Sequence, residues 1–279
     1  MTAAPSVSLS SQTIVIIGGG VMGSALCQGL LDSGLSIPQR IIVVEPEVRK
    51  RAALRETMGV SCSADGREAL PQADLIVLAI KPQVFATVAE QLRAHMRAGV
   101  LVISIMAGIP TSLIAGALAH NLIVRAMPNT AAKVRQSTTV WYAAPIVPEL
   151  LRATATAVLS SIGIAIEVQN EAILDGATAI SGSGPAYVCL LAEALVEGAV
   201  AIGLSRDLAL CLVTNTLAGT AALLAQSGAH PALVRESVTS PAGTTAAGLL
   251  ALEARAFRAA CVEAVRAAYA RAKELGSAK

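Results

Sequence analysis

The chain has 279 residues, of which 54% are hydrophobic and 14% are charged, and its net charge at pH 7 is +2. This balance excludes a disordered chain, which combines low hydrophobicity with high charge. The near-neutral charge and the scarcity of aromatic residues (one Trp, three Tyr and two Phe) also argue against nucleic-acid binding. No uninterrupted apolar run approaches 18 residues, so we expect no membrane-spanning segment.

Five cysteines are scattered through the chain without a C-x-x-C pair, at positions 27, 62, 189, 211 and 261. We expect free, mostly buried thiols in a cytoplasmic protein, because a disulfide scaffold or a zinc site needs paired spacing. No metal site is expected. Residues 1–12 are uncharged and lack the basic and apolar regions of a signal peptide, so we expect a short flexible tail.

Short β-branched runs alternate with helical stretches through the first half of the chain. The expected strands cover residues 13–17, 41–45, 75–80, 100–105 and 122–125, with further candidates at 139–142 and 164–168. Apolar strands that alternate with helices predict an α/β fold with a parallel sheet covered on both faces.

After residue 168 the strand-like runs stop. Residues 169–279 are rich in Ala and Leu, have helical periodicity, and are interrupted by SGSGP, GLS, SGAHP and SPAGTT. This pattern predicts an all-helical second domain that follows the first without a linker.

A G-x-G-x-x-G pattern at residues 18–23 follows the first strand and opens a helix, as dinucleotide binding requires. Gly18 would make the tight turn, Gly20 would let the backbone approach a pyrophosphate, and Gly23 would let helix and strand pack closely. The phosphates would lie at the helix N-terminus, where N–H groups are free. We therefore predict a Rossmann-type, doubly wound dinucleotide-binding domain over residues 13–168; a glycine-rich turn without a ligand is the alternative.

Glu45 ends the second strand, at the spacing typical of an acid that binds the adenosine ribose. Its carboxylate would accept hydrogen bonds from the 2′-hydroxyl and repel a 2′-phosphate, which favours NADH. Arg49, Lys50 and Arg51 follow closely and would pair with a 2′-phosphate if their helix tilts inward. A solvated helix face is the alternative for these basic residues.

Two further segments lie at expected strand ends, outside which ligands of open α/β sheets bind. They are IKP at residues 80–82 and SIMAG at residues 104–108. Both would line the cofactor with backbone groups. Lys81 would contact a phosphate or ribose, with a surface salt bridge as the alternative.

Two loops punctuate the helical half. SGSGPAY at residues 181–187 predicts a helix start with Pro185 in its first turn and Ser183 as a cap, and its glycines would permit close approach of a ligand or subunit. SPAGTT at residues 240–245 would present hydroxyls and amides at a helix N-terminus, which suits a small carboxylate; an ordinary Thr cap is the alternative.

Acid–base machinery is not evident in the sequence. The three histidines have no evident nucleophile or metal partner, and no G-x-S-x-G is present. Such a site suits hydride transfer to a substrate that needs little proton transfer from the protein, such as a protonated imine.

Six segments carry a family likeness, in this order: GGGVMG, LAIKPQ at 78–83, SIMAGI at 104–109, RAMPNTA at 125–131, SGSGPAY at 181–187 and VTSPAGTTAAGL at 238–249. Together they resemble pyrroline-5-carboxylate reductase, the last enzyme of proline biosynthesis, over roughly residues 14–275. SGSGPAY and the SPAGTT segment are specific to that family, whereas the glycine fingerprint is not.

The resemblance implies hydride transfer from NADPH or NADH to the C=N bond of 1-pyrroline-5-carboxylate, giving L-proline. It also implies that the helical domain, residues 169–279, binds substrate and interlocks with a second copy into a homodimer, often assembled further into a decamer. Neither a nucleic acid nor a membrane is an expected partner.

The resemblance also assigns residues. It places cofactor contacts at Ile17, Gly18, Gly19, Gly20, Val21, Met22, Gly23, Glu45, Ile80, Lys81, Pro82, Met106, Ala107 and, near the nicotinamide, Asn129. The substrate would be held by Glu171, Ser237, Ser240, Gly243, Thr244 and Thr245. Thr245 is the expected catalytic residue, through a hydrogen bond to the imine nitrogen, and Glu171 is expected to act across the dimer interface.

This chain departs from the family pattern at four positions. Members that prefer NADPH carry a Ser, Asn or Arg-type residue near Glu45 and an Asn where this chain has Gly66, which leaves the cofactor preference open. Met106 replaces a smaller residue and is expected to narrow the cofactor site. Ser237 stands where Asn is often found, which would shift substrate choice toward another cyclic imino acid.

Two alternatives to the leading function remain. One is a reductase of another cyclic imino acid, such as a pyrroline-2-carboxylate-type compound. The other is a dinucleotide-binding regulatory protein that has lost catalysis. A hydroxyacid dehydrogenase is disfavoured because residues 174–187 contain no lysine that would serve as its catalytic group.

Overall fold

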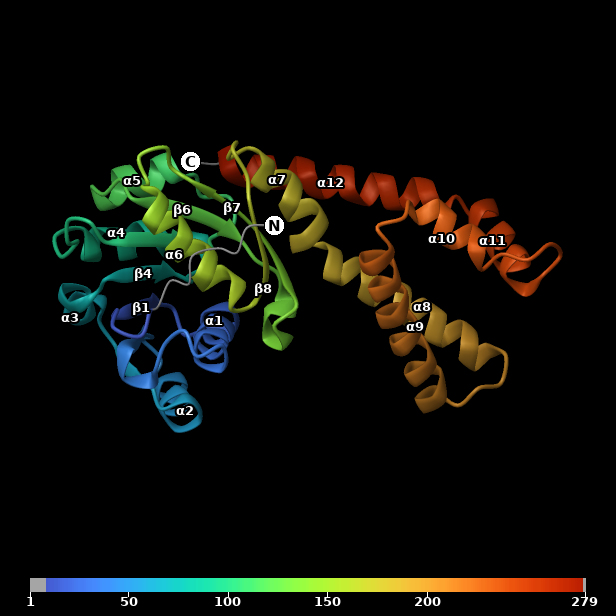
Figure 1. Ribbon diagram of the computed structural model, residues 1–279, viewed down its shortest axis with the longest axis horizontal. Helices are drawn as coiled ribbons and strands as arrows, with labels where there is room; N and C mark the ends of the chain where they lie inside the picture. Colours follow the sequence, from blue (N-terminus) through green and yellow to red (C-terminus); the bar gives the residue numbers. More distant parts are fainter. Residues whose placement is uncertain (1–8, 278–279) are drawn as a thin grey trace. The chain divides into compact units, whose positions relative to one another are not determined.

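The computed structural model describes residues 9–277, which form two compact units (Figure 1). The first unit contains the chain up to residue 183 together with residues from 268 onward, and the second contains residues 184–267. Most of the predicted N-terminal tail lies outside the described residues. Residues 9–12 of that segment are described, and Leu9 departs from the expected flexible tail, because its side chain is fully buried in the core of the first unit.

An eight-stranded sheet forms the centre of the first unit, in the order β3-β2-β1-β4-β5-β6-β7-β8. The strands are β1 (Ile14–Ile17), β2 (Ile41–Val44), β3 (Ser61–Ser63), β4 (Leu75–Leu78), β5 (Leu101–Ser104), β6 (Ile123–Met127), β7 (Ser137–Ala143) and β8 (Gly163–Glu167). The run 3-2-1-4-5-6 is the strand order of a dinucleotide-binding fold, with its switch point between β1 and β4.

One strand pair departs from the predicted parallel sheet. β7 pairs with β6 antiparallel, whereas every other neighbouring pair is parallel. The connection between them contains only the short 3-10 helix η4 (Thr130–Val134). A parallel crossover needs a dozen or more residues, so this short connection produces an antiparallel pair.

Helices cover both faces of the sheet because the strand residues alternate between two buried clusters. Ile14 and Ile16 pack with α1 (Val21–Asp32), α2 (Val48–Met58) and α6 (Glu149–Ser160). Val15 and Ile17 face α3 (Gly66–Ala69), α4 (Phe85–Arg93) and α5 (Thr111–Leu118). Each fully buried aliphatic side chain contributes about 1.5–3 kcal/mol. The predicted α/β fold class is confirmed. The remaining 3-10 helices are η1 (Pro38–Arg40), η2 (Leu70–Gln72) and η3 (Pro82–Val84).

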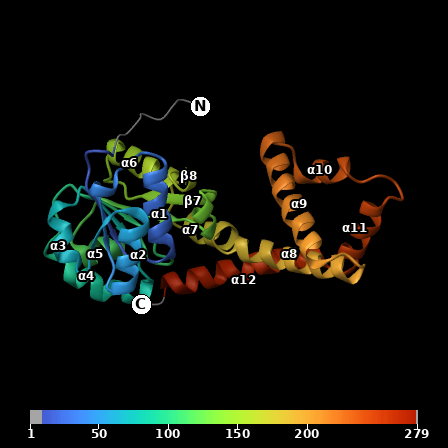
Figure 2. The same ribbon diagram turned by 90° about the horizontal axis from the view of Figure 1, so that it is seen from below.

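From residue 173 to the end of the described chain the elements are helical, as predicted. They are α7 (Ile173–Ala177), the π-helical turn η5 (Thr178–Gly182), α8 (Gly184–Ala201), α9 (Arg206–Ser227), α10 (Pro231–Ser237), α11 (Thr244–Ala254) and α12 (Phe257–Ser277). α8 and α9 pack together around a small buried cluster (Val196, Ala209 and Val213). The C-terminal turns of α12 belong to the first unit (Figure 2).

The SGSGP segment agrees in part with its prediction as a helix start: α8 begins at Gly184 with Pro185 in its first turn, but the predicted Ser183 cap is wrong. The chain is already helical before it, and the Ser183 N–H donates to the Thr178 carbonyl at 2.8 Å, a π-type bond. Pro185 has no N–H, so it cannot continue the regular helical ladder across this point. Ser183 therefore does not cap a new helix, and the segment is a π turn that leads into α8. Such turns are frequent at functional sites.

The helices of the second unit expose much apolar surface in the single chain. Leu190 is 67% exposed and Leu210 is 52% exposed. Two helical segments, Ile173–Ala201 and Arg206–Ser227, are long and apolar enough to cross a membrane, which corrects the expectation that no segment would be. Length and composition alone are weak evidence for a membrane, and a second protein surface would cover such helices equally well.

The cysteines also differ in part from expectation. All five are free, but only Cys27 is buried, Cys62 is half-buried and the other three are exposed in the single chain. The three exposed thiols lie on α8, α9 and α12, on the same helices that expose apolar side chains.

Candidate active site

Backbone carbonyl groups leave no room for a side chain at two glycines of the loop between β1 and α1. Gly18 has φ +108°, and a Cβ added there would lie 2.6 Å from the Ala79 carbonyl oxygen. A Cβ on Gly23 would lie 2.0 Å from the Gly18 carbonyl oxygen. At Gly20, by contrast, no atom lies within 4 Å of an added Cβ. Gly18 and Gly23 therefore serve the fold, and Gly20 leaves open space beside the N-terminus of α1, where a pyrophosphate would fit.

Glu45 is bound directly to this loop. Its side chain is 7% exposed, and Oε2 accepts a hydrogen bond from the Gly19 N–H at 3.1 Å. Oε1 accepts another from the Glu47 N–H at 3.0 Å. A carboxylate has about four acceptor positions, so two remain for a ribose hydroxyl.

The basic residues after Glu45 are largely engaged by the protein. Arg51 donates to the carbonyl oxygens of Glu45 and Pro46, at 2.6 and 2.7 Å. Lys50 pairs with Glu47 at 2.8 Å on the exposed surface, and this carboxylate raises the pKa of the Lys50 ammonium. These contacts agree with the solvated helix face more closely than with a preformed phosphate site.

Gly66, where the family pattern has Asn, is buried at the start of α3. A Cβ added there would lie 2.5 Å from Leu92 Cδ2, so a side chain would fit only if Leu92 moved. Its neighbour Asp65 caps the helix by accepting from the Arg67 N–H at 2.9 Å. The Arg67 guanidinium also hydrogen-bonds to Asp65 and lowers the pKa of that carboxyl group.

The segments after β4 and β5 lie at the carboxyl edge of the sheet, as predicted. Ile80 and Lys81 follow β4, and Pro82 begins η3. After β5, Met106 donates its N–H to Ser104 Oγ at 3.3 Å, but its side chain is 1% exposed and belongs to a core cluster. Met106 therefore fills the core, which differs from the expectation that its side chain would narrow a cofactor site.

Asn129 follows β6 at the same edge. Its Oδ1 accepts from the Ala131 N–H at 3.1 Å, and its own N–H donates to Ser137 Oγ at 3.0 Å. The side chain thus caps η4. Its amide nitrogen is the group that would donate to a nicotinamide, as the resemblance predicts.

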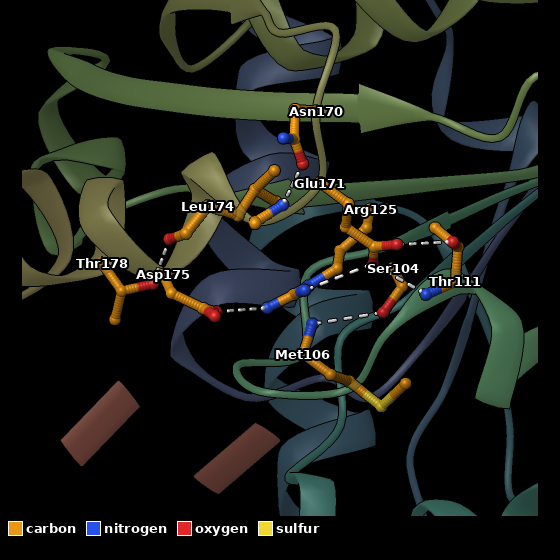
Figure 3. A network of polar contacts seen from close by, with 10 residues as sticks. Ser104, Met106, Thr111, Arg125, Asn170, Glu171, Leu174, Asp175 and Thr178 are labelled. Carbon is orange, nitrogen blue, oxygen red and sulfur yellow. Dashed lines mark hydrogen bonds and ion pairs between the residues drawn. The ribbon is translucent and has the colours of Figure 1, made fainter. Parts of the chain in front are cut away.

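Arg125 forms a polar network that was not among the sequence predictions (Figure 3). It lies in β6, is 6% exposed, and contacts Glu171 Oε1 at 3.2 Å and Asp175 Oδ1 at 3.3 Å. Glu171 also accepts from the Thr111 N–H at 2.8 Å and from Thr111 Oγ1 at 2.7 Å. A sequence signal existed, because an arginine inside a buried strand requires a charged partner.

The predicted substrate loop lies in the second unit, before α11. Gly243 is the N-cap residue with no side-chain cap, and its N–H donates to the Ser240 carbonyl at 3.1 Å. A Cβ on Gly243 would lie 2.2 Å from Ser240 Oγ, so any other residue there would require this hydroxyl to move. The ordinary Thr cap is therefore not what forms here. Thr244 and Thr245 open the helix with N–H groups that have no intrahelical partner.

Ser237 is the last residue of α10, and its hydroxyl donates to the Val234 carbonyl at 2.8 Å. The predicted cofactor residues lie in the first unit, and the predicted substrate residues other than Glu171 lie in the second. The individual contacts with cofactor and substrate stay predictions.

Known protein families match both the N-terminal and the C-terminal part of the chain. Residues 171–275 match the family model described as pyrroline-5-carboxylate reductase dimerisation. Residues 13–108 match the model described as NADP oxidoreductase, coenzyme F420-dependent. A pyrroline-5-carboxylate reductase of Synechocystis sp. is 43% identical over 261 residues, which cover 94% of this chain and 97% of that protein. This chain belongs to the pyrroline-5-carboxylate reductase family.

Solved structures of the family have the same fold. A pyrroline-5-carboxylate reductase from Coxiella burnetii is 36% identical, with a TM-score of 0.88 over 95% of this chain and 99% of that one. A pyrroline carboxylate reductase from Plasmodium falciparum with NADP bound is 29% identical, with a TM-score of 0.86 over 96% and 99%. The predicted family is therefore confirmed, and a nicotinamide dinucleotide is its cofactor.

Proposed function

We propose that this chain is a pyrroline-5-carboxylate reductase. It transfers hydride from a reduced nicotinamide dinucleotide to the imine carbon of 1-pyrroline-5-carboxylate, and the protonated imine nitrogen becomes the amine of L-proline. Its family membership over nearly the whole chain carries the proposal. The test is oxidation of NADH or NADPH by purified protein with this substrate, with proline identified as the product.

The bound dinucleotide supplies the hydride, and the protein supplies position. Backbone N–H groups at the start of α1 hold the pyrophosphate beside Gly20, where the loop is open. Ser240 and the free amides of Thr244 and Thr245 hold the substrate carboxylate at the start of α11. The protonated imine nitrogen donates a hydrogen bond to the Thr245 hydroxyl, which orients the C=N bond. Because the nitrogen already carries its proton, hydride transfer needs no general acid from the protein.

The cofactor preference we propose is NADH. Glu45 faces the glycine loop as a buried acceptor, and a 2′-phosphate would meet its carboxylate. Arg51 is occupied by backbone carbonyls, and Gly66 offers no polar side chain. NADPH is the alternative, because the Plasmodium falciparum relative binds NADP. Steady-state kinetics with both cofactors separate the two.

A related cyclic imine is the second candidate substrate. Ser237 is shorter than the Asn expected beside the substrate loop, and its hydroxyl is bonded within its own helix. A wider pocket would follow, which suits a different ring or carboxylate position. Comparing kcat/KM for pyrroline-5-carboxylate and a pyrroline-2-carboxylate-type compound decides between them. Cofactor binding without turnover of any imine would favour a regulatory protein instead.

We propose that residues 169–279 act as the substrate-binding and dimerisation domain of a cytoplasmic homodimer, which assembles further into a decamer. The exposed apolar faces of α8 and α9 support a protein partner, as does the dimerisation family model over residues 171–275. Leu190→Glu should yield monomers in sedimentation velocity experiments. Ile146→Glu is the control, because Ile146 is also an exposed apolar residue but lies in the first unit. The Ile146→Glu protein should remain oligomeric.

A further inference from the structure

The Arg125 guanidinium joins three segments of the first unit. It lies in β6 and reaches Glu171, just before α7, and Asp175, within α7 (Figure 3). Glu171 in turn accepts two hydrogen bonds from Thr111, the first residue of α5. The loop between β5 and α5 is therefore held at its far end by this network.

Both Glu171 oxygens have partners within the chain. Oε1 is shared by Arg125 and the Thr111 N–H, and Oε2 accepts from Thr111 Oγ1. This carboxylate is thus placed to orient protein groups. A buried ion pair contributes little net stability, because desolvation offsets the attraction. We therefore expect this network to hold the three segments in a fixed geometry rather than to add stability to the fold.

The network adjoins the part of the sheet edge where the nicotinamide would lie. Glu45 places the adenosine ribose at the end of β2, so a dinucleotide that crosses the switch point between β1 and β4 extends toward β5 and β6. The loop held by Thr111 contains Met106 and Ala107. At the other end of this loop, the Met106 side chain packs in the core and the Met106 N–H donates a hydrogen bond to Ser104 Oγ.

We propose that Arg125 is a positioning residue for the proposed reduction: through Glu171 and Thr111 it fixes the loop of residues 105–110 that receives the nicotinamide. Asp175 pairs with the other nitrogen of the guanidinium, so α7 also helps to fix the position of Arg125. Glu171 then acts through the protein rather than by touching the substrate. The inference rests on the proposed function only for the reaction itself, because nicotinamide binding is measurable without an imine.

The experiment compares Arg125→Met, Arg125→Lys and a triple variant in which all three side chains are uncharged. The triple variant combines Arg125→Met, Glu171→Gln and Asp175→Asn. Arg152→Met is the matched control, since Arg152 is half-buried and pairs with Glu167 between α6 and β8. Calorimetry gives the affinities for NADH and for ADP-ribose, which lacks the nicotinamide. Turnover with dideuterated NADH (both hydrogens at C4 of the nicotinamide) gives the primary isotope effect on kcat.

We expect Arg125→Met and the triple variant to bind ADP-ribose within about threefold of wild type and to bind NADH about tenfold more weakly. Their isotope effect should rise, because a misplaced ring makes hydride transfer limit the rate. Arg125→Lys should be intermediate, since an ammonium lacks the fork that reaches two carboxylates. Arg152→Met should lower only the melting temperature.

Unchanged NADH affinity and isotope effect in the triple variant would overturn the proposal, as would an equal loss of ADP-ribose binding. If Arg125→Met does not fold, the triple variant decides, because it leaves no uncompensated carboxylate. A wild-type protein that binds NADH but reduces no imine would refute the proposed function, while the affinity comparison would still test the role of Arg125.

Discussion

The Glu45 carboxylate accepts a hydrogen bond from the Gly19 N–H at 3.1 Å, so the acid at the end of β2 and the glycine loop after β1 are one structural unit. Glu45 thereby has two tasks. It holds the loop in place, and its remaining acceptor positions are available to a ribose hydroxyl.

Replacing Glu45 with Ser should raise the ratio of kcat/KM for NADPH to that for NADH by at least about tenfold, because repulsion of the 2′-phosphate is removed. Affinity for both cofactors should fall, because the Gly19 N–H loses its partner. Steady-state kinetics with both cofactors measure the ratio. Glu47→Ser removes a neighbouring exposed carboxylate and is the control. An equal change in both variants would mean that only net charge matters.

Two glycines of the loop should respond differently to alanine. Gly23→Ala places a Cβ 2.0 Å from the Gly18 carbonyl and should reduce stability by about 1–3 kcal/mol. Gly20→Ala meets no atom within 4 Å and has φ −73°, so its melting temperature should match wild type. Its cofactor affinity should nevertheless fall, because the methyl group occupies the place of the pyrophosphate. Normal affinity in Gly20→Ala would place the dinucleotide elsewhere.

Replacing Thr245 with Ala should lower kcat/KM for the imine by about a hundredfold, the effect of removing one oriented hydrogen bond in a water-poor site. Thr245→Ser keeps the hydroxyl and should recover most of the activity. Cofactor affinity should not change in either variant, because Thr245 lies in α11 and the glycine loop lies in the first unit. Parallel loss of cofactor binding would be inconsistent with the proposed site.

Cys27 should make stability depend on pH in the alkaline range. Burial raises the pKa of its thiol from 9.0 to about 12, with a smaller contribution from Cys62. A raised pKa means that the folded state retains the proton, so this stability is complete below pH 9 and is lost as pH rises toward 12.

The unfolding free energy of wild type relative to Cys27→Ala should therefore fall by up to about 1.4 kcal/mol per pH unit above pH 9. Urea titrations at fixed protein concentration from pH 8 to 10.5 measure the difference. A difference that stays constant over this range would show that the thiol is as easily ionised in the folded protein as in the unfolded chain.

The sequence predicted the strands of the sheet to within about two residues because apolar β-branched runs mark buried strands clearly. β3 was missed, since Ser61, Cys62 and Ser63 form a short edge strand without such a run. The strand β7 was predicted at residues 139–142, but its antiparallel direction was not, because periodicity carries no information on strand direction. Leu9 was assigned to a tail because one apolar residue in a polar segment does not indicate that it packs on the core.

The glycine loop was predictable because dinucleotide binding depends on glycines at a fixed local spacing. The Arg125 network was predictable only in that a buried arginine requires a charged partner. Its partners were not predictable, because Thr111, Arg125 and Glu171 are far apart in sequence and meet only in the fold. For the same reason Glu171 was assigned by resemblance to substrate, whereas its visible partners are protein groups. The π turn at residues 178–182 was not predicted, because a Gly/Ser run before Pro185 is as typical of a loop as of a helical turn.

The proposed imine reduction is measured by assaying purified wild-type protein with 1-pyrroline-5-carboxylate and each reduced cofactor, while proline is quantified. We predict that one molecule of proline forms for each cofactor oxidised, with kcat/KM higher for NADH than for NADPH. If protein that binds both cofactors oxidises neither of them, this chain is not a pyrroline-5-carboxylate reductase.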